Sequence, residues 1–286
     1  MPFRYINPGY AELFRNKSMT TGQSNTFNPI NDVYMKNGEA YCSLPDGCSE
    51  VWVKFGFYYN GYNYQMGCYF GDNQASYGFY RYKCEENKAN FNKKSTLISN
   101  NADYAYHTVW MHCRAGQDGI LEIFVDGREE FTQTGAIVWK EQYVYFKSGS
   151  DRVYLSNIII SDREISKTDE VYILEPAGTE TDMTESDGVY IADSEGQYIR
   201  QTIDVDAFKE KAGSSAVSVT GLAVASVPAY YDGEGLTTLT ATRNEVEMES
   251  LVLSTVEAKK GVISSWDESM DVDSLATIKL GWKVAN

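Results

Sequence analysis

The sequence predicts an all-β protein in which a large sandwich of short strands is followed by a smaller β-rich, sandwich-like module with one short helix. Three observations support this fold class. Short apolar and alternating runs recur along the chain, turn residues separate them about every eight to twelve positions, and no long helical period occurs. The hydrophobic content of 43% over 286 residues is enough for a real core.

The first part of the chain is predicted to contain several strands joined by tight turns. In the run 51–57, alternation places Val51, Val53, Phe55 and Phe57 on one face. Asp126-Gly127 predicts a hairpin, because a type I′ turn needs positive φ at both central residues. A second turn is expected at 116–119. The expected strands are 50–59, 64–70, 77–83, 107–113, 120–125, 143–147 and 153–160.

The chain is predicted to divide into a domain at 1–165, a linker at 166–182 and a second module at 183–286. The linker is rich in charged and small polar residues, with a short strand expected at 171–174. In the second module, 204–213 reads as a helix, since Asp stands at its start and Gly just past its end. The other expected elements are a hairpin of 188–192 with 197–203, strands at 216–225, 235–241, 249–256, 261–266 and 278–284, and a helical turn at 271–277.

The net charge of −15 is unevenly distributed. Residues 1–165 carry 16 Lys and Arg against 18 Asp and Glu, whereas residues 166–286 carry 9 against 22. This acidity argues against binding of nucleic acid through phosphate neutralisation. The sequence contains no apolar run of about 18 residues, so no membrane span is expected. The N-terminus lacks the apolar core of a secretory signal, and the odd cysteine count of five favours reduced thiols in a protein made in the cytosol.

Residue patterns typical of catalysis are weak. His107 and His112 are five positions apart, which on a strand places them on opposite faces, so no metal pair is expected. Glu122 reads as a lone acid on a solvated face, and Glu129 and Glu130 are adjacent, so they too point to opposite faces. Glycosidases need two carboxylates facing one bond. We therefore expect no enzyme and no catalytic residues, with a glycoside hydrolase as the less favoured alternative.

The stretch 57–106 is the best sequence candidate for a recognition surface. It holds ten tyrosines and eight asparagines, residue types that binding loops use because Tyr offers wide contact at low entropic cost and Asn adapts its hydrogen bonds. The alternative is that these tyrosines are ordinary strand residues. The predicted ligand-binding residues are Tyr59, Asn60, Tyr62, Asn63, Tyr64, Asp72 and Asn73.

Two segments resemble the closing half of concanavalin-A-like (laminin-G-like) jelly rolls. They are ILEIFVDG at 120–127 and LSNIIISD at 155–162. The resemblance implies a jelly-roll sandwich at 1–165 whose first and last strands lie side by side, so that N-terminal residues pack near 155–160. It also implies calcium as an optional loop-bound ion, for which the sequence marks no ligand set. Other than calcium, no cofactor is expected.

Longer stretches are similar to a type of phage structural protein. They are residues 1–14, LSNIIISDREIS at 155–166, TETDMT at 179–184, 196–208, 219–241 and LATIKLGWKV at 275–284. This resemblance implies a non-enzymatic virion protein, either tail, fibre or capsid decoration. Its lectin-like domain would bind glycan or host surface, and its partners would be other virion proteins and copies of itself, a trimer being one form.

The alternative is a carbohydrate-binding module or adhesin at the bacterial cell surface. In the virion reading, residues 183–286 are the docking or oligomerisation part, with an apolar seam of Leu236, Leu239, Leu280 and Trp282. The N-terminal arm, 1–30, is the alternative anchor.

Overall fold

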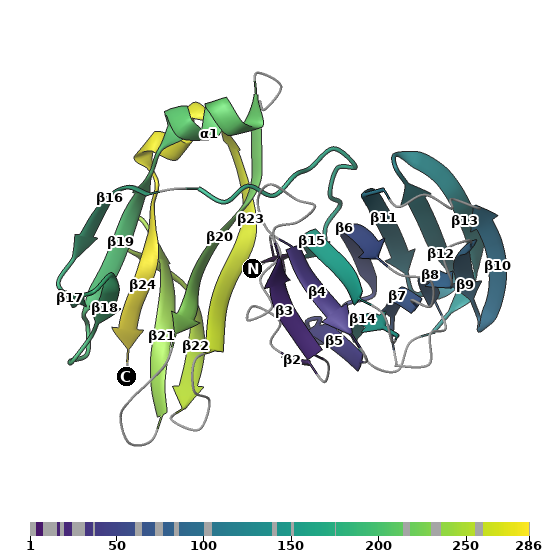
Figure 1. Ribbon diagram of the computed structural model, residues 1–286, viewed down its shortest axis with the longest axis horizontal. Helices are drawn as coiled ribbons and strands as arrows, with labels where there is room; N and C mark the ends of the chain where they lie inside the picture. Colours follow the sequence, from purple (N-terminus) through teal and green to yellow (C-terminus); the bar gives the residue numbers. More distant parts are fainter. Residues whose placement is uncertain are drawn as a thin grey trace. The chain divides into compact units, whose positions relative to one another are not determined.

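The structure is a computed structural model that divides into two compact units, Met1–Val171 and Tyr172–Asn286 (Figure 1). The described residues are 4–7, 16–17, 20–24, 32–36, 38–60, 65–71, 77–82, 86–99, 105–138, 142–149, 152–174, 176–213, 218–229, 236–254 and 260–285.

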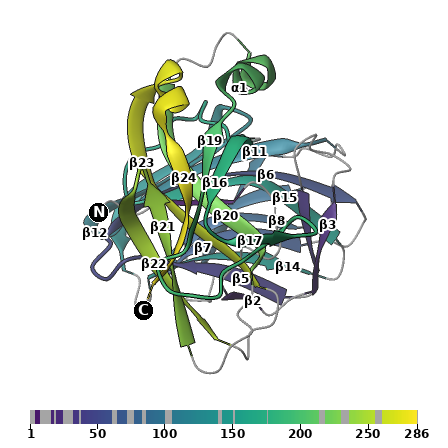
Figure 2. The same ribbon diagram turned by 90° about the vertical axis from the view of Figure 1, so that its left-hand side faces the viewer.

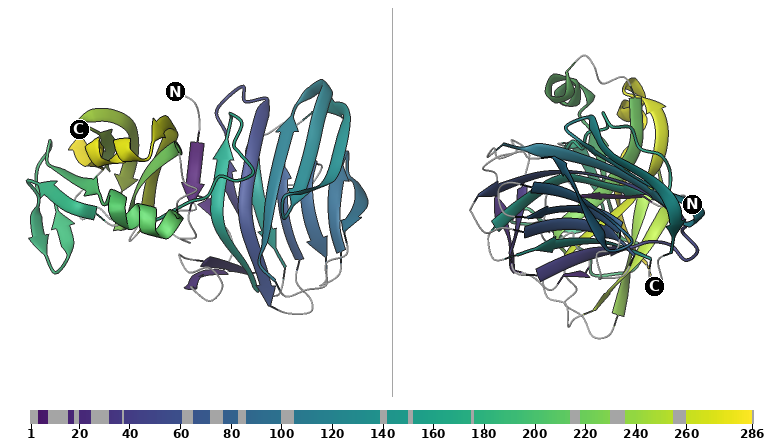
Figure 3. Two further views of the ribbon diagram at one scale, coloured as in Figure 1. Left: turned by 90° about the horizontal axis from the view of Figure 1, so that it is seen from above. Right: turned by 90° about the vertical axis from the view of Figure 1, so that its right-hand side faces the viewer.

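The first unit is built from two antiparallel sheets, drawn from purple to teal in Figures 1 and 3. Sheet A has the order β13 (Arg128–Ile137), β12 (Gly116–Val125), β11 (His107–Arg114), β6 (Glu50–Asn60), β15 (Arg152–Ser161), β4 (Asp32–Lys36) and β3 (Thr20–Ser24), with β1 (Arg4–Asn7) also paired to β15. Sheet B has the order β10 (Lys94–Ser99), β9 (Glu86–Phe91), β8 (Tyr77–Tyr82), β7 (Gln65–Phe70), β14 (Tyr143–Ser148), β5 (Gly38–Ser43) and β2 (Asn16–Lys17). The predicted jelly-roll sandwich is confirmed.

The core of this unit lies between the two sheets. Val51, Val53, Phe55 and Phe57, predicted to share one face of β6, are all fully buried. The ring of Phe55 lies 5.3 Å from that of Phe146 on β14, an edge contact that joins sheet A to sheet B. Burying a Phe side chain of this kind contributes about 1.5–3 kcal/mol. The alternate residues of β6 therefore face away from the core, on what we call the outer face of sheet A.

The first and last strands of this unit lie side by side, as expected. Arg4–Asn7 pairs antiparallel with β15, from Arg4 opposite Ser161 to Asn7 opposite Ile158. The Asp126-Gly127 turn is also present, with φ of +52° and +76°, as a type I′ hairpin between β12 and β13 requires. Between β6 and β15, three strands had no counterpart among the predicted ones, namely β9, β10 and β13, whose polar sequences lack a clear apolar alternation. The strands β1 to β5, which precede β6, had none either.

The second unit combines a five-stranded sheet with a long two-stranded ribbon, drawn from green to yellow (Figure 2). The sheet has the order β16 (Pro176–Thr181), β19 (Tyr198–Ile203), β24 (Lys279–Ala285), β21 (Leu236–Arg243) and β22 (Val246–Ser254), and the ribbon pairs β20 (Ser218–Ala229) with β23 (Lys260–Asp271). Its main core cluster contains Phe208, Leu222, Trp266, Leu275 and Ile278.

The helix α1 (Val205–Ala212) and a 3₁₀ turn (Asp273–Thr277) lie near each other at one end of these strands (Figure 2). Asp204 is the N-cap of α1, and its carboxylate accepts a 2.9 Å hydrogen bond from the backbone N–H of Ala207. Gly213 ends the helix with φ of +73°. The helix predicted from this Asp and Gly is therefore present at its predicted position.

Three predictions between residues 166 and 203 are wrong. Part of the expected linker 166–182 is strand β16, which pairs with β19, and no strand forms at 171–174. The expected hairpin of 188–192 with 197–203 does not form either. Instead β18 (Val189–Ile191) pairs with β17 (Thr184–Ser186) around Asp187-Gly188, whose φ values of +50° and +76° suit a tight hairpin. β19 is thereby left to join the larger sheet.

Three residues of the proposed apolar seam pack within the second unit. Trp282 is 5% exposed and packs with Ala241 and Leu239, and Leu280 is partly buried against the main core cluster of the same unit. The side chain of Leu236 lies outside the described ones. Among the described residues, no helix has the length and apolar character that a membrane crossing requires.

Candidate functional site

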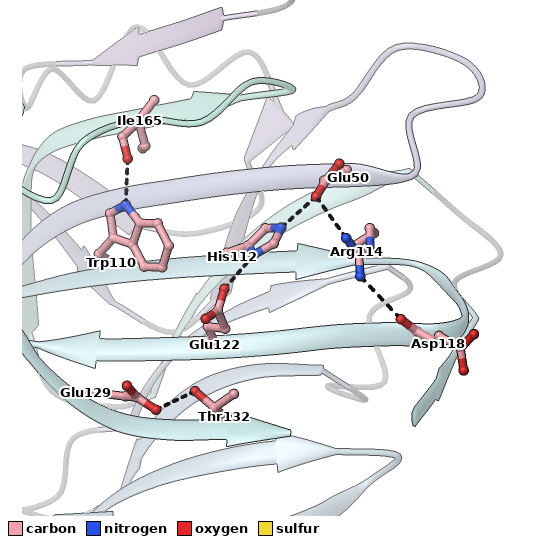
Figure 4. A network of polar contacts seen from close by, with 9 residues as sticks. All are labelled: Glu50, Trp110, His112, Arg114, Asp118, Glu122, Glu129, Thr132 and Ile165. Carbon is pink, nitrogen blue, oxygen red and sulfur yellow. Dashed lines mark hydrogen bonds and ion pairs between the residues drawn. The ribbon is translucent and has the colours of Figure 1, made fainter. Parts of the chain in front are cut away.

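A cluster of aromatic and charged side chains lies on the outer face of sheet A. The strand register places Trp52 of β6 opposite His112 of β11, and His112 opposite Glu122 of β12. The neighbouring pair in the same register is Glu50 with Arg114. These five residues, which we call the His112 cluster, come from three adjacent strands and share one face of the sheet. Figure 4 shows four of them, Glu50, His112, Arg114 and Glu122.

His112 lies between two carboxylates. Its Nδ1 is 2.7 Å from Glu122 Oε2, and its Nε2 is 2.9 Å from Glu50 Oε1. A neutral imidazole has one N–H and one acceptor nitrogen, so both contacts are hydrogen bonds only when both nitrogens carry hydrogen. The ring is 8% exposed, and it holds the two glutamate side chains in place from both ends.

Trp52 stacks on this fixed imidazole. The two rings are parallel within 4°, with centroids 4.5 Å apart. The carboxylate side chains beside it remain partly open to solvent, at 35% for Glu50 and 28% for Glu122, and Arg114 is 49% exposed. The outcome is a preoriented aromatic ring beside hydrogen-bonding groups on an accessible sheet face.

A segment that follows β15 borders the cluster on one side. Residues 162–171, which we call the strap, cross the outer face over the next pair of the register, Lys54 and Trp110. The indole N–H of Trp110 donates a 2.9 Å hydrogen bond to the carbonyl of Ile165 (Figure 4). The ammonium of Lys167 lies 3.8 Å from the ring centroid of Phe124 and 4.8 Å from that of Trp110, both cation–π contacts.

Lys54 is buried beneath the strap. Its ammonium donates to the carbonyl of Asp169, and the side chain is 6% exposed. Burial lowers the pKa of Lys54, and the negative charges of Glu170 and Asp169 offset part of that effect. Lys54 is therefore engaged by the strap, whereas Lys167 is an exposed residue of the strap whose ammonium lies over two aromatic rings.

The predicted ligand-binding residues are largely untested. Tyr59 and Asn60 end strand β6, paired with Val153 and Arg152 of β15. The other five lie outside the described residues, namely Tyr62, Asn63, Tyr64, Asp72 and Asn73.

Several tyrosines of the 57–106 stretch pack on sheet B. Tyr69 stands in a cross-strand row with Tyr145 and Tyr41, and its ring stacks on that of Tyr80 at 6.1 Å. Tyr69 is only 3% exposed, and burial, with smaller effects of Tyr80 and Cys68, raises the pKa of its hydroxyl. Tyr77 is likewise buried, at 4%. Tyr69 and Tyr77 are therefore buried strand residues, as the alternative to a recognition surface predicted.

The sequence analysis missed the cluster, although two of its parts were noted. His107 and His112 do lie on opposite faces, since His107 pairs with buried Phe57 and His112 with Trp52. Glu122 is not a lone solvated acid, because it binds His112. The available signal was Trp52, a large aromatic residue on the outward-facing positions of an amphipathic strand. Within the described ranges, no group of three or more His, Cys, Asp or Glu is arranged to hold a metal ion.

Comparison with known proteins adds the fold alone. No family model and no curated protein matches the chain. Among solved structures, an endo-β-1,4-glucuronan lyase from Trichoderma reesei is similar over 55% of this chain and 94% of that one, with 11% identity and a TM-score of 0.42. A carbohydrate esterase from the Shiga toxin-encoding bacteriophage phi24B is similar over 51% of this chain and 86% of that one, with 9% identity and a TM-score of 0.37. The carbohydrate-binding module CBM66 from Bacillus subtilis is similar over 51% of this chain and 95% of that one, with 11% identity and a TM-score of 0.34.

Proposed function

We propose that this chain is a non-enzymatic carbohydrate-binding protein of a phage virion, and that its jelly-roll unit binds glycan through the His112 cluster. One observation carries the binding proposal. Trp52, stacked on an imidazole that two carboxylates hold, offers a fixed aromatic face beside hydrogen-bond acceptors. Sugars present both apolar ring faces, which stack on aromatic side chains, and hydroxyl groups, which carboxylates accept.

The non-enzymatic part of the proposal follows from how His112 is used. Both of its ring nitrogens already contact carboxylate oxygens. To act as a general base, the imidazole would have to give up one of these contacts, whereas as a structural centre it needs both. The virion part is supported by the similarity of six stretches to phage structural proteins, among them LSNIIISDREIS at 155–166.

The test is glycan binding by the full chain and by variants of Trp52. An array of bacterial surface glycans identifies the ligand, and titration calorimetry measures its affinity. We expect Trp52→Ala to weaken binding by about tenfold or more, since an aromatic contact contributes about 1.5 kcal/mol beyond buried area. Trp52→Phe, which keeps a ring, should retain part of the affinity.

The matched control is Glu129→Gln, an exposed acid on β13 that hydrogen-bonds Thr132 and lies outside the cluster (Figure 4). It should bind like the unaltered protein. Binding that is equally strong after Trp52→Ala, in a protein with an unchanged circular dichroism spectrum, would place the site elsewhere. An array without any bound glycan would remove the carbohydrate proposal.

A further inference from the structure

Resting on the proposed function, we infer that the His112 cluster selects neutral, hydroxyl-rich glycans and discriminates against glycans built from uronic acids. Some hydrogen-bonding groups of the cluster already have partners within the protein, and others remain open to a ligand. The selection depends on charge and geometry of this face alone.

The acceptors are open. Glu122 uses Oε2 on His112, and Glu50 uses Oε1 on His112. Within the described part of the chain, the second oxygen of each carboxylate has no hydrogen-bond donor, and both side chains are about one-third exposed. Ionised carboxylates are acceptors only, so each of these oxygens fits a hydroxyl donor of a ligand. Hydrogen bonds to a charged group are stronger than those between neutral groups.

Apart from Arg114, the nitrogen-bearing side chains nearest the two glutamates already have contacts. Both nitrogens of His112 face the glutamates, Lys54 donates to the strap carbonyl of Asp169, and Lys167, an exposed residue of the strap, lies over Phe124 and Trp110. A uronate carboxylate entering the cluster would therefore meet two carboxylates of its own sign within a few ångströms. Like charges placed this closely repel each other, and salt screens part of that repulsion because both glutamates are about one-third exposed.

Arg114 is the exposed cation beside the two glutamates. Its Nη1 is 4.0 Å from Glu50 Oε1, and its Nη2 donates a long 3.5 Å hydrogen bond to the carbonyl of Asp118. An incoming carboxylate would have to share this guanidinium with Glu50. A hydroxyl would not, because it can donate to the glutamate and accept from the arginine at the same time.

The experiment compares oligosaccharides that differ only at C6. The full chain is titrated with cellohexaose against a glucuronan hexamer, and with mannohexaose against a mannuronan hexamer, at low and high salt. We expect the neutral member of a bound pair to bind at least about tenfold more tightly at low salt, with a smaller difference at high salt because salt screens the repulsion.

Glu122→Gln tests the same point within the protein, with Glu129→Gln as the control of equal charge change. Glu122→Gln should weaken binding of the neutral oligosaccharide by about tenfold, the cost of one charged hydrogen bond. It should also reduce the ratio of the affinity for the neutral member to that for the uronate member. Tighter binding of the uronate member would overturn the inference and leave the glycan-binding proposal in place. Binding of no sugar in these pairs or on the array would overturn the proposed function itself.

Discussion

His112 illustrates how a single residue organises this surface. Its ring nitrogens hold Glu50 and Glu122, and its ring face supports Trp52, so one side chain joins strands β6, β11 and β12 on the outer face of sheet A. Hydrogen bonds to charged groups contribute about 1.5–3 kcal/mol each. The same contacts that strengthen the sheet also reduce the freedom of the groups proposed to meet a ligand.

Asp126 has a comparable role at the β12–β13 turn. Its carboxylate accepts hydrogen bonds from Nδ1 of His107 at 2.7 Å and from the backbone N–H of Thr108 at 2.9 Å. Burial by itself would raise the pKa of Asp126, but these two hydrogen bonds and the positive charges of His107 and Arg81 outweigh it, so the pKa lies below its usual value. The ionised form is therefore favoured in the folded state.

The expected consequence is a specific loss of stability in acid. A carboxyl with a lowered folded pKa stabilises the fold above its unfolded pKa, about 3.9, and this contribution is lost as pH falls through the folded value. Asp126→Asn should keep the turn, since Asn tolerates the φ of +52°, but unfold with a shallower pH dependence below about pH 4. Urea unfolding over a pH series measures this. Identical pH slopes in both proteins would contradict it.

The strap is the element that separates the His112 cluster from the rest of the outer face. Trp110 and Lys54 hold its backbone carbonyls, Lys167 lies over two rings, and the side chain of Ile165 is 1% exposed. A segment without regular secondary structure is thus fixed by side-chain contacts from the sheet beneath it. The carbonyls of Ile165 and Asp169 are thereby paired, as buried backbone groups must be.

We expect Lys167→Gln to loosen the strap without loosening the sheet. The change removes the cation–π contact, worth about 0.5–1 kcal/mol at an exposed site, but keeps an unbranched polar side chain. Amide hydrogen exchange should become severalfold faster for 164–170 and stay the same in β6 and β11. Lys94→Gln, at an exposed position on β10, is the matched control. Unchanged exchange in the strap would show that Lys167 does not hold it.

The whole molecule consists of two units with separate cores and different charge. Phe55 and Phe146 belong to the core of the first, and Phe208 and Trp266 to that of the second. Most of the net charge of −15 lies beyond residue 165. The second unit pairs exposed charges between strands of its main sheet, as in Lys279 with Glu180 and Lys283 with Glu247, which is typical of a solvated surface.

The virion proposal is tested on the native protein. We expect the chain to copurify with a phage particle as a symmetric homo-oligomer, a trimer being one form, and to appear in cryo-electron microscopy reconstructions of that particle. Light scattering of the purified protein gives the oligomer mass. A monomer that sediments with no particle, but is found on bacterial cells, would replace the virion proposal with that of a cell-surface adhesin.

Local signals predicted much of the fold. The alternation at Val51, Val53, Phe55 and Phe57 placed one face of β6 in the core, and Asp126-Gly127 marked a hairpin. The signal failed where a segment was polar, as in β16, because its strand character comes from pairing with β19 and not from its own side chains. It also failed at Asp187-Gly188, a turn signal overlooked between the predicted linker, 166–182, and the predicted hairpin of 188–192 with 197–203.

By itself the sequence determined the all-β class, the core-facing sides of the strands, the helix that begins after Asp204 and the acidity of the second unit. These features depend on side-chain period, turn chemistry and composition, all of which act over a few residues. Only the tertiary structure decided the candidate site. Glu50 and His112 are 62 positions apart and His112 and Glu122 are 10 apart, and strand register alone brings their side chains within 3 Å. Register depends on how whole strands pair within the sheet, so no local pattern around His112 could reveal its partners.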